Sequence, residues 1–472
     1  MSSSTEAPVS GAVAPLSSSQ SWGAEFRALL KLGWPLIIAQ LAQSALFTTD
    51  IIMLGRLGGR FVAAGALANA LFICIQLFGI GIVGAVAPMV AQAIGARDFR
   101  SVRRTVRQGV WLSVMLFVLL LPLAWNIGPI YRWMGQDAEL IALAETFIHA
   151  AVWLLLPAFV FIALRSFLSA HGATRAILVI TVAGVVVNAL ANYALVFGNW
   201  GFPRLEMVGS GISTTVVNTV MLLLTILYIQ MHKRFRRYHI WHQMLTPDWK
   251  RLWELTRIGV PIGAMLLAEV ALFTSASLLQ GWLGEAELAA HSVALTVASL
   301  AFMVPLGISQ ATTVRVGIAL GERNPEGVRK SGWAALALTL GFMSLTAIAF
   351  FLVPHQIVSL FLDPAQAENT APLALAASFL LVAGIFQLVD GTQVTMAAAL
   401  RGLSDTNMPL VIALLGYWAV GFPIAYLCGF TLGFRGVGIW IGLAAGLAAV
   451  ALVLTIRFAM RDRLGLTQKA VV

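Results

Sequence analysis

Three acidic residues stand inside long apolar runs of this chain, namely Asp50, Glu269 and Asp390. An ionised carboxylate in hydrocarbon is costly, so acids at such positions usually face a cavity and carry ions or protons. The alternative is a protonated acid that is hydrogen-bonded within a helix bundle. We expect the first role for Glu269 and Asp390, with binding of a cation or a proton as the chemistry.

Neutral oxygen donors accompany Asp50. Asn188 and Asn192 are four residues apart and share one helix face, and Thr214 lies early in a later apolar run. One carboxylate with amide and hydroxyl oxygens suits a small hard cation or a relayed proton. Interhelical hydrogen bonding by polar residues is an equally good interpretation of the spacing.

The composition places these residues in a membrane. Of the 472 residues 59% are hydrophobic and 11% are charged, against about 25% charged in a soluble domain. This excludes a soluble enzyme and a disordered chain, and the two cysteines exclude a disulfide scaffold. The net charge of +10 is explained by basic loops between spans, so we expect a lipid bilayer and no nucleic acid as partner.

Apolar runs long enough to cross a bilayer as helices predict an all-α polytopic membrane protein. No segment outside them is long enough for a separate domain. The predicted spans are residues 29–54, 62–93, 108–130, 141–164, 176–198, 208–231, 253–280, 288–318, 331–353, 371–398, 408–430 and 436–459.

Basic residues predict the orientation. With both termini in the cytoplasm, 25 of the 30 Lys and Arg residues fall on the inner side, Arg165 among them. This asymmetry follows the positive-inside rule and supports an even number of spans with both termini inside. We expect an integral multi-pass protein of the plasma (inner) membrane. The outer side receives Arg56, Arg60, Arg132, Arg204 and Arg435.

An internal repeat divides the chain into two halves of six spans. Residues 32–58 and 258–284 share 11 of 27 positions at an offset of 226. Six spans is an even number, so the lobes are related by a pseudo-two-fold axis along the membrane normal, with a substrate site between them. Pro35 and Pro261 match in the repeat and are candidate hinges, although a static kink is equally plausible.

The repeat also predicts domain boundaries and unequal lobes. Glu269 aligns with Gln43, so the lobes hold one carboxylate and two carboxylates respectively. The expected domains are a disordered cytoplasmic tail (1–24), an N-lobe (25–231), a cytoplasmic connector (232–252), a C-lobe (253–460) and a second tail (461–472).

Three segments resemble the multidrug and toxic compound extrusion (MATE) family, NorM-type branch. They are LGWPLIIAQLAQSALFTTDIIMLGRLG (32–58), its echo RIGVPIGAMLLAEVALFTSASLLQGWLG (257–284), and GIFQLVDGTQVTMAAALRGLSD (384–405). The resemblance covers residues 25–460. It implies a monomeric antiporter, not an enzyme, that exports amphipathic organic cations in exchange for sodium ions or protons by rocker-switch alternating access, without a cofactor.

The resemblance also implies roles for the polar residues. Asp50, with Asn188, Asn192 and Thr214, resembles the N-lobe cation or proton site. Glu269 and Asp390 resemble the C-lobe acids that couple ion and drug. Sodium at either site remains open, because some relatives have Tyr where this chain has Phe386.

Two other functions compete with this prediction. A flippase for lipid-linked oligosaccharides would favour basic residues in the cavity, whereas no Lys or Arg is expected in the middle of a span here. An intramembrane enzyme would require a cluster such as His/Asp or Ser/Lys near one interface, and the sequence offers none. Sequence alone does not decide between sodium and protons.

Overall fold

A computed structural model describes residues 21–242, 244, 246–366 and 369–468 of the chain. Twelve helical segments in this part are long and apolar enough to cross a membrane. The described residues contain no strand. The predicted all-α protein of twelve spans is therefore confirmed.

The first six spans include two that are interrupted, and short helices flank them. The second span ends in a separate short helix, and the fourth changes helix midway. The elements are α1 (Trp22–Gly55), α2 (Gly59–Val83), α3 (Val86–Gly95), α4 (Phe99–Trp125), α5 (Ile127–Trp133), α6 (Ala138–Ala151), α7 (Leu155–Ala170), α8 (Thr174–Leu195), α9 (Glu206–Met231) and α10 (Lys233–Arg236).

The second half repeats this order with longer, less interrupted helices. The eleventh span contains two π-helical segments, residues 415–421 and 427–431. The elements are α11 (Trp249–Leu283), α12 (Glu285–Gly321), α13 (Pro325–Leu352), α14 (Pro354–Val358), α15 (Thr370–Gly402), α16 (Asn407–Leu414), α17 (Phe422–Tyr426) and α18 (Arg435–Ala459).

Short polar side chains cap several of these helices and set where they begin. The Asp98 carboxylate accepts from the backbone N–H groups of Arg100 and Ser101, both at 3.0 Å. Asn324 accepts from Gly327 N–H at 2.9 Å. Such caps satisfy donors that a helix start leaves unpaired. The predicted tail (1–24) is too long, because residues 22–24 form the first turn of α1; residues 1–20 lie outside the described part.

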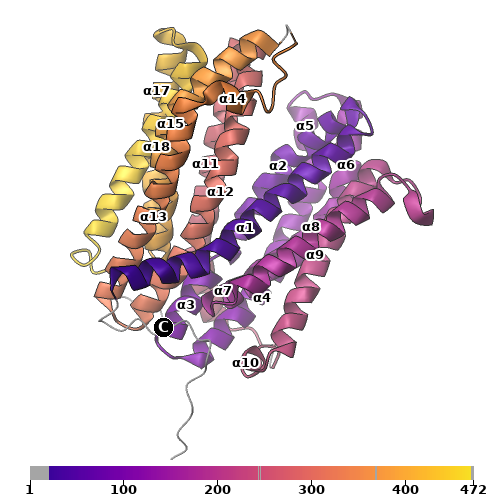
Figure 1. Cartoon of the computed structure of the whole chain (residues 1–472). Helices are drawn as coiled ribbons and strands as arrows, with labels where there is room; N and C mark the ends of the chain where they lie inside the picture. The colour runs from indigo at the N-terminus through magenta and orange to yellow at the C-terminus, as the bar shows by residue number, and fades with distance from the viewer. Residues whose placement is uncertain (1–20, 243, 245, 367–368, 469–472) are drawn as a thin grey trace, which may run out of the picture.

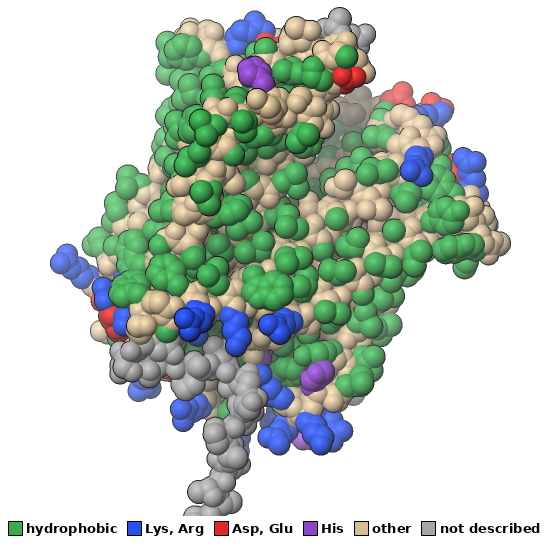
Figure 2. All heavy atoms as spheres, in the orientation of Figure 1, with side chains coloured by type: hydrophobic (Ala, Val, Ile, Leu, Met, Phe, Trp, Pro, Cys, Tyr) green, Lys and Arg blue, Asp and Glu red, His purple; other side chains and the backbone are tan. Residues whose placement is uncertain are grey.

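The two halves form two lobes that converge at one end (Figure 1). We call that end, where α10 and the residues before α11 lie, the connector side. Basic side chains gather there, and a broad apolar band covers the surface above them (Figure 2). Toward the opposite side the lobes diverge, and the surface is hollowed between them (Figure 2). We call this hollow the cleft.

Glycines allow the lobes to approach closely on the connector side. A Cβ atom at Gly95 would lie 2.1 Å from the Ile318 carbonyl oxygen, and one at Gly321 would lie 2.0 Å from the Gln92 carbonyl oxygen. Gly95 and Gly321 are equivalent in the repeat, so α3 and α12 cross almost symmetrically. Backbone contact this close excludes any side chain at either position.

Candidate functional site

The N-lobe site forms where α1, α8 and α9 meet. Asn188 and Asn192 of α8 each donate a side-chain N–H to Asp50 Oδ1, at 3.0 and 2.7 Å. The Thr214 hydroxyl reaches Asp50 and also the Ser210 carbonyl, at 3.0 Å, so its one proton serves one of them at a time. The structure thus brings all four predicted residues together.

Both asparagines that hold this carboxylate keep an unpaired oxygen. The side-chain oxygens of Asn188 and Asn192 are buried and have no hydrogen-bond partner among the described residues, and the same is true of the Ser210 and Ser213 hydroxyls on α9. A buried acceptor without a donor is destabilising. The same oxygens are suitable ligands for a small cation or a hydrated proton.

The C-lobe site joins α11 and α15. Asp390 is buried, and its Oδ1 atom has no partner in the described part of the chain. Glu269 lies within electrostatic range of Asp390 and within hydrogen-bonding reach of Gln393. Two carboxyl groups this close repel each other when both are ionised, so the pair favours a bound proton or cation.

Two further polar residues of the C-lobe site were missed by the sequence analysis. Gln393 donates to the Tyr417 hydroxyl at 2.6 Å, and both residues are buried. Gln393 is three residues after Asp390, so helical spacing could have indicated it. Tyr417 lies in a π-helical segment, and no local sequence pattern predicts that segment.

Aromatic rings line the same region. Phe386 is one helical turn before Asp390 and meets Phe273 and Trp440 edge-on, with centroids 6.0 and 5.5 Å apart. His291 lies 5.6 Å from the Trp440 ring and 3.1 Å from the Ser277 hydroxyl. Phe386 therefore contributes ring faces and edges where a tyrosine would add an oxygen.

The candidate hinges lie inside continuous helices. Pro35 belongs to α1 and Pro261 to α11, and both are buried. Figure 1 shows α1 changing direction, so that its first turns run beneath the C-lobe while its remainder belongs to the N-lobe. Pro35 removes one backbone hydrogen bond from this helix, which is consistent with the bend. A hinge role remains a prediction.

A buried ion pair joins the first turns of α1 to the C-lobe. The Glu25 carboxylate accepts from Arg315 Nε at 3.0 Å and Nη2 at 2.5 Å, and from the Ser331 hydroxyl at 2.7 Å. The side chains of Glu25 and Arg315 are each 2% exposed. This contact therefore joins the two lobes on the connector side.

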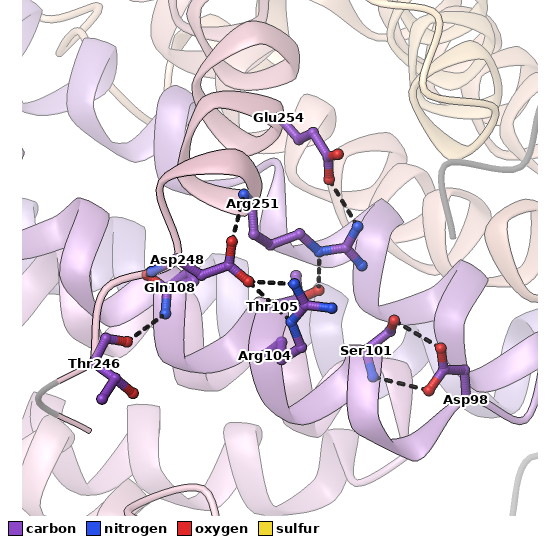
Figure 3. Close-up of polar contacts among 9 residues, drawn as sticks. All are labelled: Asp98, Ser101, Arg104, Thr105, Gln108, Thr246, Asp248, Arg251 and Glu254. Carbon is purple, nitrogen blue, oxygen red and sulfur yellow. Dashed lines mark hydrogen bonds and ion pairs between the residues drawn. The ribbon is translucent and has the colours of Figure 1, made fainter. Parts of the chain in front are cut away.

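The second half of the repeat makes a matching contact, in which Arg251 stands where the first half has Glu25. Arg251 of α11 donates to the Thr105 hydroxyl of α4 at 3.1 Å and pairs with Glu254 at 2.9 Å (Figure 3). Residues 25 and 251 are 226 apart, as are 105 and 331. Each lobe therefore holds the first turns of the other lobe's first helix.

The α11 cap strengthens this second contact. Asp248 caps α11 through the Arg251 N–H at 3.2 Å and pairs with Arg104, whose Nε lies 2.9 Å away (Figure 3). Burial alone would raise the pKa of the Asp248 carboxyl, but these partners together hold it below its ordinary value. Asp248 is therefore ionised at neutral pH.

One arginine differs from its predicted place. Arg165, assigned to an inner loop, lies inside α7 and is buried. It donates to Gln40 of α1 and Gln310 of α12. The predicted span 141–164 therefore ends too early, because the helix continues past Arg165 to Ala170. Charge counting could not show this, because Arg165 is only five residues from the end of its helix.

The fold and its paired sites define a multi-pass membrane transporter made of two six-helix lobes. Comparisons identify its family. The MatE family model matches residues 35–194 and 261–427. The chain is 42% identical over 445 residues to a probable multidrug resistance protein NorM of Mesorhizobium japonicum, covering 94% of this chain and 95% of the relative.

A second probable NorM protein, from Rhizobium meliloti, is 44% identical over 441 residues, covering 93% and 94% of the two chains. The chain therefore belongs to the MatE family, in its NorM-type branch, and it is a transporter and not an enzyme. The solved structure of the eukaryotic MATE transporter AtDTX14 has the same fold, with a TM-score of 0.85 at 22% identity and coverage of 95% and 98%.

Proposed function

We propose that this protein exports amphipathic organic cations in exchange for sodium ions or protons. The main support for this proposal is Asp390, whose buried side-chain oxygen is unpaired among the described residues. This carboxylate interacts electrostatically with Glu269 and lies one helical turn after Phe386, which packs against Trp440. A carboxylate pair supplies negative charge, and the Phe273 ring, which packs against Phe386 and is only partly buried, supplies apolar contact and cation–π attraction. The relatives named as multidrug resistance proteins support drugs as the cargo.

Competition for one charge site is the simplest coupling. A sodium ion or proton bound at Glu269 and Asp390 cancels the charge that the cationic drug needs, so each weakens the other's affinity equally. The N-lobe oxygens around Asp50 offer a second place for the ion. The part of the chain that the structure describes has no group of three or more His, Cys, Asp and Glu suited to a metal ion, so a sodium site would use amide and hydroxyl oxygens as well.

Alternating access follows from placing the connector side in the cytoplasm. The basic surface supports that orientation, with both termini inside an inner membrane. The lobes then meet on the inside and the cleft opens outward. Rocking of the lobes would break the Glu25–Arg315 pair and open the inner side. Each chain contains both lobes, which supports a monomer as the working unit.

Transport in everted membrane vesicles tests the proposal. The lumen is loaded with sodium in one series and acidified in the other, each gradient alone, and uptake of a cationic dye is followed. We expect uptake under one gradient or both, and none with the matched isosteric variant Asp390→Asn. Wild-type protein that accumulates no dye under either gradient would contradict antiport.

A flippase for lipid-linked oligosaccharides is the second candidate. It would require positive charge in the cavity to hold pyrophosphate, and Arg401 does lie in electrostatic range of Glu269. The carboxyl groups outnumber it at that site, however. Cationic cargo is therefore the better match to the C-lobe.

A further inference from the structure

Arg165 joins the two lobes without an acidic partner. Its Nη2 group donates to Gln40 Oε1 at 2.9 Å and to Gln310 Oε1 at 2.7 Å. Its side chain is only 7% exposed. No Asp or Glu of the described residues forms an ion pair with it. A full positive charge is therefore buried between neutral amides.

Three polar contacts join the lobes near the ends of α3, α7 and α12, and they differ in their distance from those ends. Gln310 lies eleven residues before the end of α12, or about 16 Å along the helix, whereas Arg315 lies six residues, about 9 Å, from it. Gln92, which donates to the Gly402 carbonyl at 2.9 Å, is three residues from the end of α3. Of these three contacts, that of Arg165 therefore involves the α12 residue farthest from the connector-side end of the helix.

The charge of Arg165 is not needed for its hydrogen bonds. A neutral donor could bond the same two amides, and burying an unpaired charge is costly. The triplet Ala163-Leu164-Arg165 recurs in α15, where its arginine, Arg401, has Glu269 in electrostatic range. Only the N-lobe arginine lacks a compensating acid, so a role for the uncompensated charge itself is indicated.

We propose that Arg165 determines charge specificity at the closed inner end of the cleft. While the lobes are together on the connector side, its positive charge repels the organic cations and coupling ions held above it. Cations then return to the inside only when the lobes move. This inference rests on the proposed function, since a repelling positive charge is useful only to a transporter of cations.

The expected size of the effect follows from Coulomb's law. Two unit charges about 8 Å apart, at an effective dielectric constant of about 20, reduce the occupancy of the position beside Arg165 about 30-fold. Removing the charge should raise passive leakage of cations by about that factor. It should not change leakage of neutral solutes, because the packing of the glycine contacts is untouched.

The test uses the full-length protein in liposomes with no ion gradient. Entry of labelled tetraethylammonium, a quaternary cation, is compared with entry of erythritol, a neutral solute. We expect Arg165→Gln to raise tetraethylammonium entry about 30-fold with erythritol unchanged, and Arg165→Lys to behave as wild type. Gln92→Ala, which removes an uncharged interlobe bond, is the matched control and should leave both rates low.

A second variant keeps the arginine and cancels its charge. Gln310→Glu places a carboxylate beside Arg165 and should raise cation entry as Arg165→Gln does. Unchanged cation entry in both variants would refute the inference, as would equal increases for cation and erythritol or an equal leak in Gln92→Ala. Failure of the proposed function is distinguishable, because wild-type protein would then transport no cation under any gradient.

Discussion

Replacing Glu25 by glutamine should shift the protein toward the state that is open on the connector side. The carboxylate receives three hydrogen bonds, from two Arg315 nitrogens and the Ser331 hydroxyl, in a contact that is 2% exposed on both sides. Glu25→Gln leaves Arg315 buried without a counter-charge, which costs about 3–5 kcal/mol.

This loss of free energy affects only the conformation that is closed on the connector side. The pair joins α1 to α12 across the lobes, so only the conformation closed on the connector side loses it; in the other, both groups can be hydrated. A destabilisation of about 3 kcal/mol changes the ratio of the two conformations about 150-fold. Glu25→Leu combined with Arg315→Met should restore most of the balance, because an apolar pair carries no buried charge.

Distances between spin labels would measure this shift. Gln136 and Gln356 are exposed on opposite lobes at the open side, and labels there report the width of the cleft, with Cys74 and Cys428 replaced. We expect the long distance in the parent protein, a shorter one in Glu25→Gln, and the long one again in the double variant. An unchanged distance distribution in Glu25→Gln would refute the assigned role of the ion pair.

Three further outcomes are expected. Glu269→Gln and Asp390→Asn should each abolish drug export while membrane abundance stays near normal, as measured by resistance and immunoblotting; wild-type export by both would refute their role. Gly321→Ala should block full closure on the connector side, because its Cβ would lie 2.0 Å from a carbonyl oxygen, and a shortened Gln136–Gln356 distance would show it. Asp248→Asn keeps the helix cap but removes the ion pair to Arg104. The pKa of Asp248 is lower in the folded protein than in the unfolded chain. Its ionised form therefore stabilises the fold at pH values above the unfolded-chain pKa, and this stabilisation is lost as the pH falls through the folded-state pKa. Thermal unfolding should show a loss of about 1 kcal/mol or less at pH 7 and a difference that shrinks as the pH falls below about 4; a difference that stays constant in acid would contradict this.

Local patterns in the sequence predicted the twelve spans and the grouping around Asp50. Apolar length marks a span, and helical spacing of four placed Asn188 and Asn192 on one face. Both signals depend on residues close together in the chain, and the hydrogen bonds to Asp50 agree with them.

Contacts that depend on how the lobes dock were not predictable in this way. Arg165 meets Gln40 and Gln310 only after α1, α7 and α12 are packed. The repeat aligned residue 25 with residue 251, yet one is Glu and the other Arg, so the shared position gave no sign that each binds the opposite lobe. The roles of the carboxylates in coupling remain predictions.

The ion pair of Glu25 also has a consequence for biosynthesis. Its partner Arg315 is 290 residues farther along the chain. At a synthesis rate of about 5–20 residues per second, Glu25 leaves the ribosome about 15–60 s before Arg315. During that time the first helix cannot take its final position at the membrane surface, because the lobe that holds its first turns does not exist. The pair can therefore close only in a chain whose second half has been made, and a product truncated after six spans would keep this acid accessible to quality-control proteases.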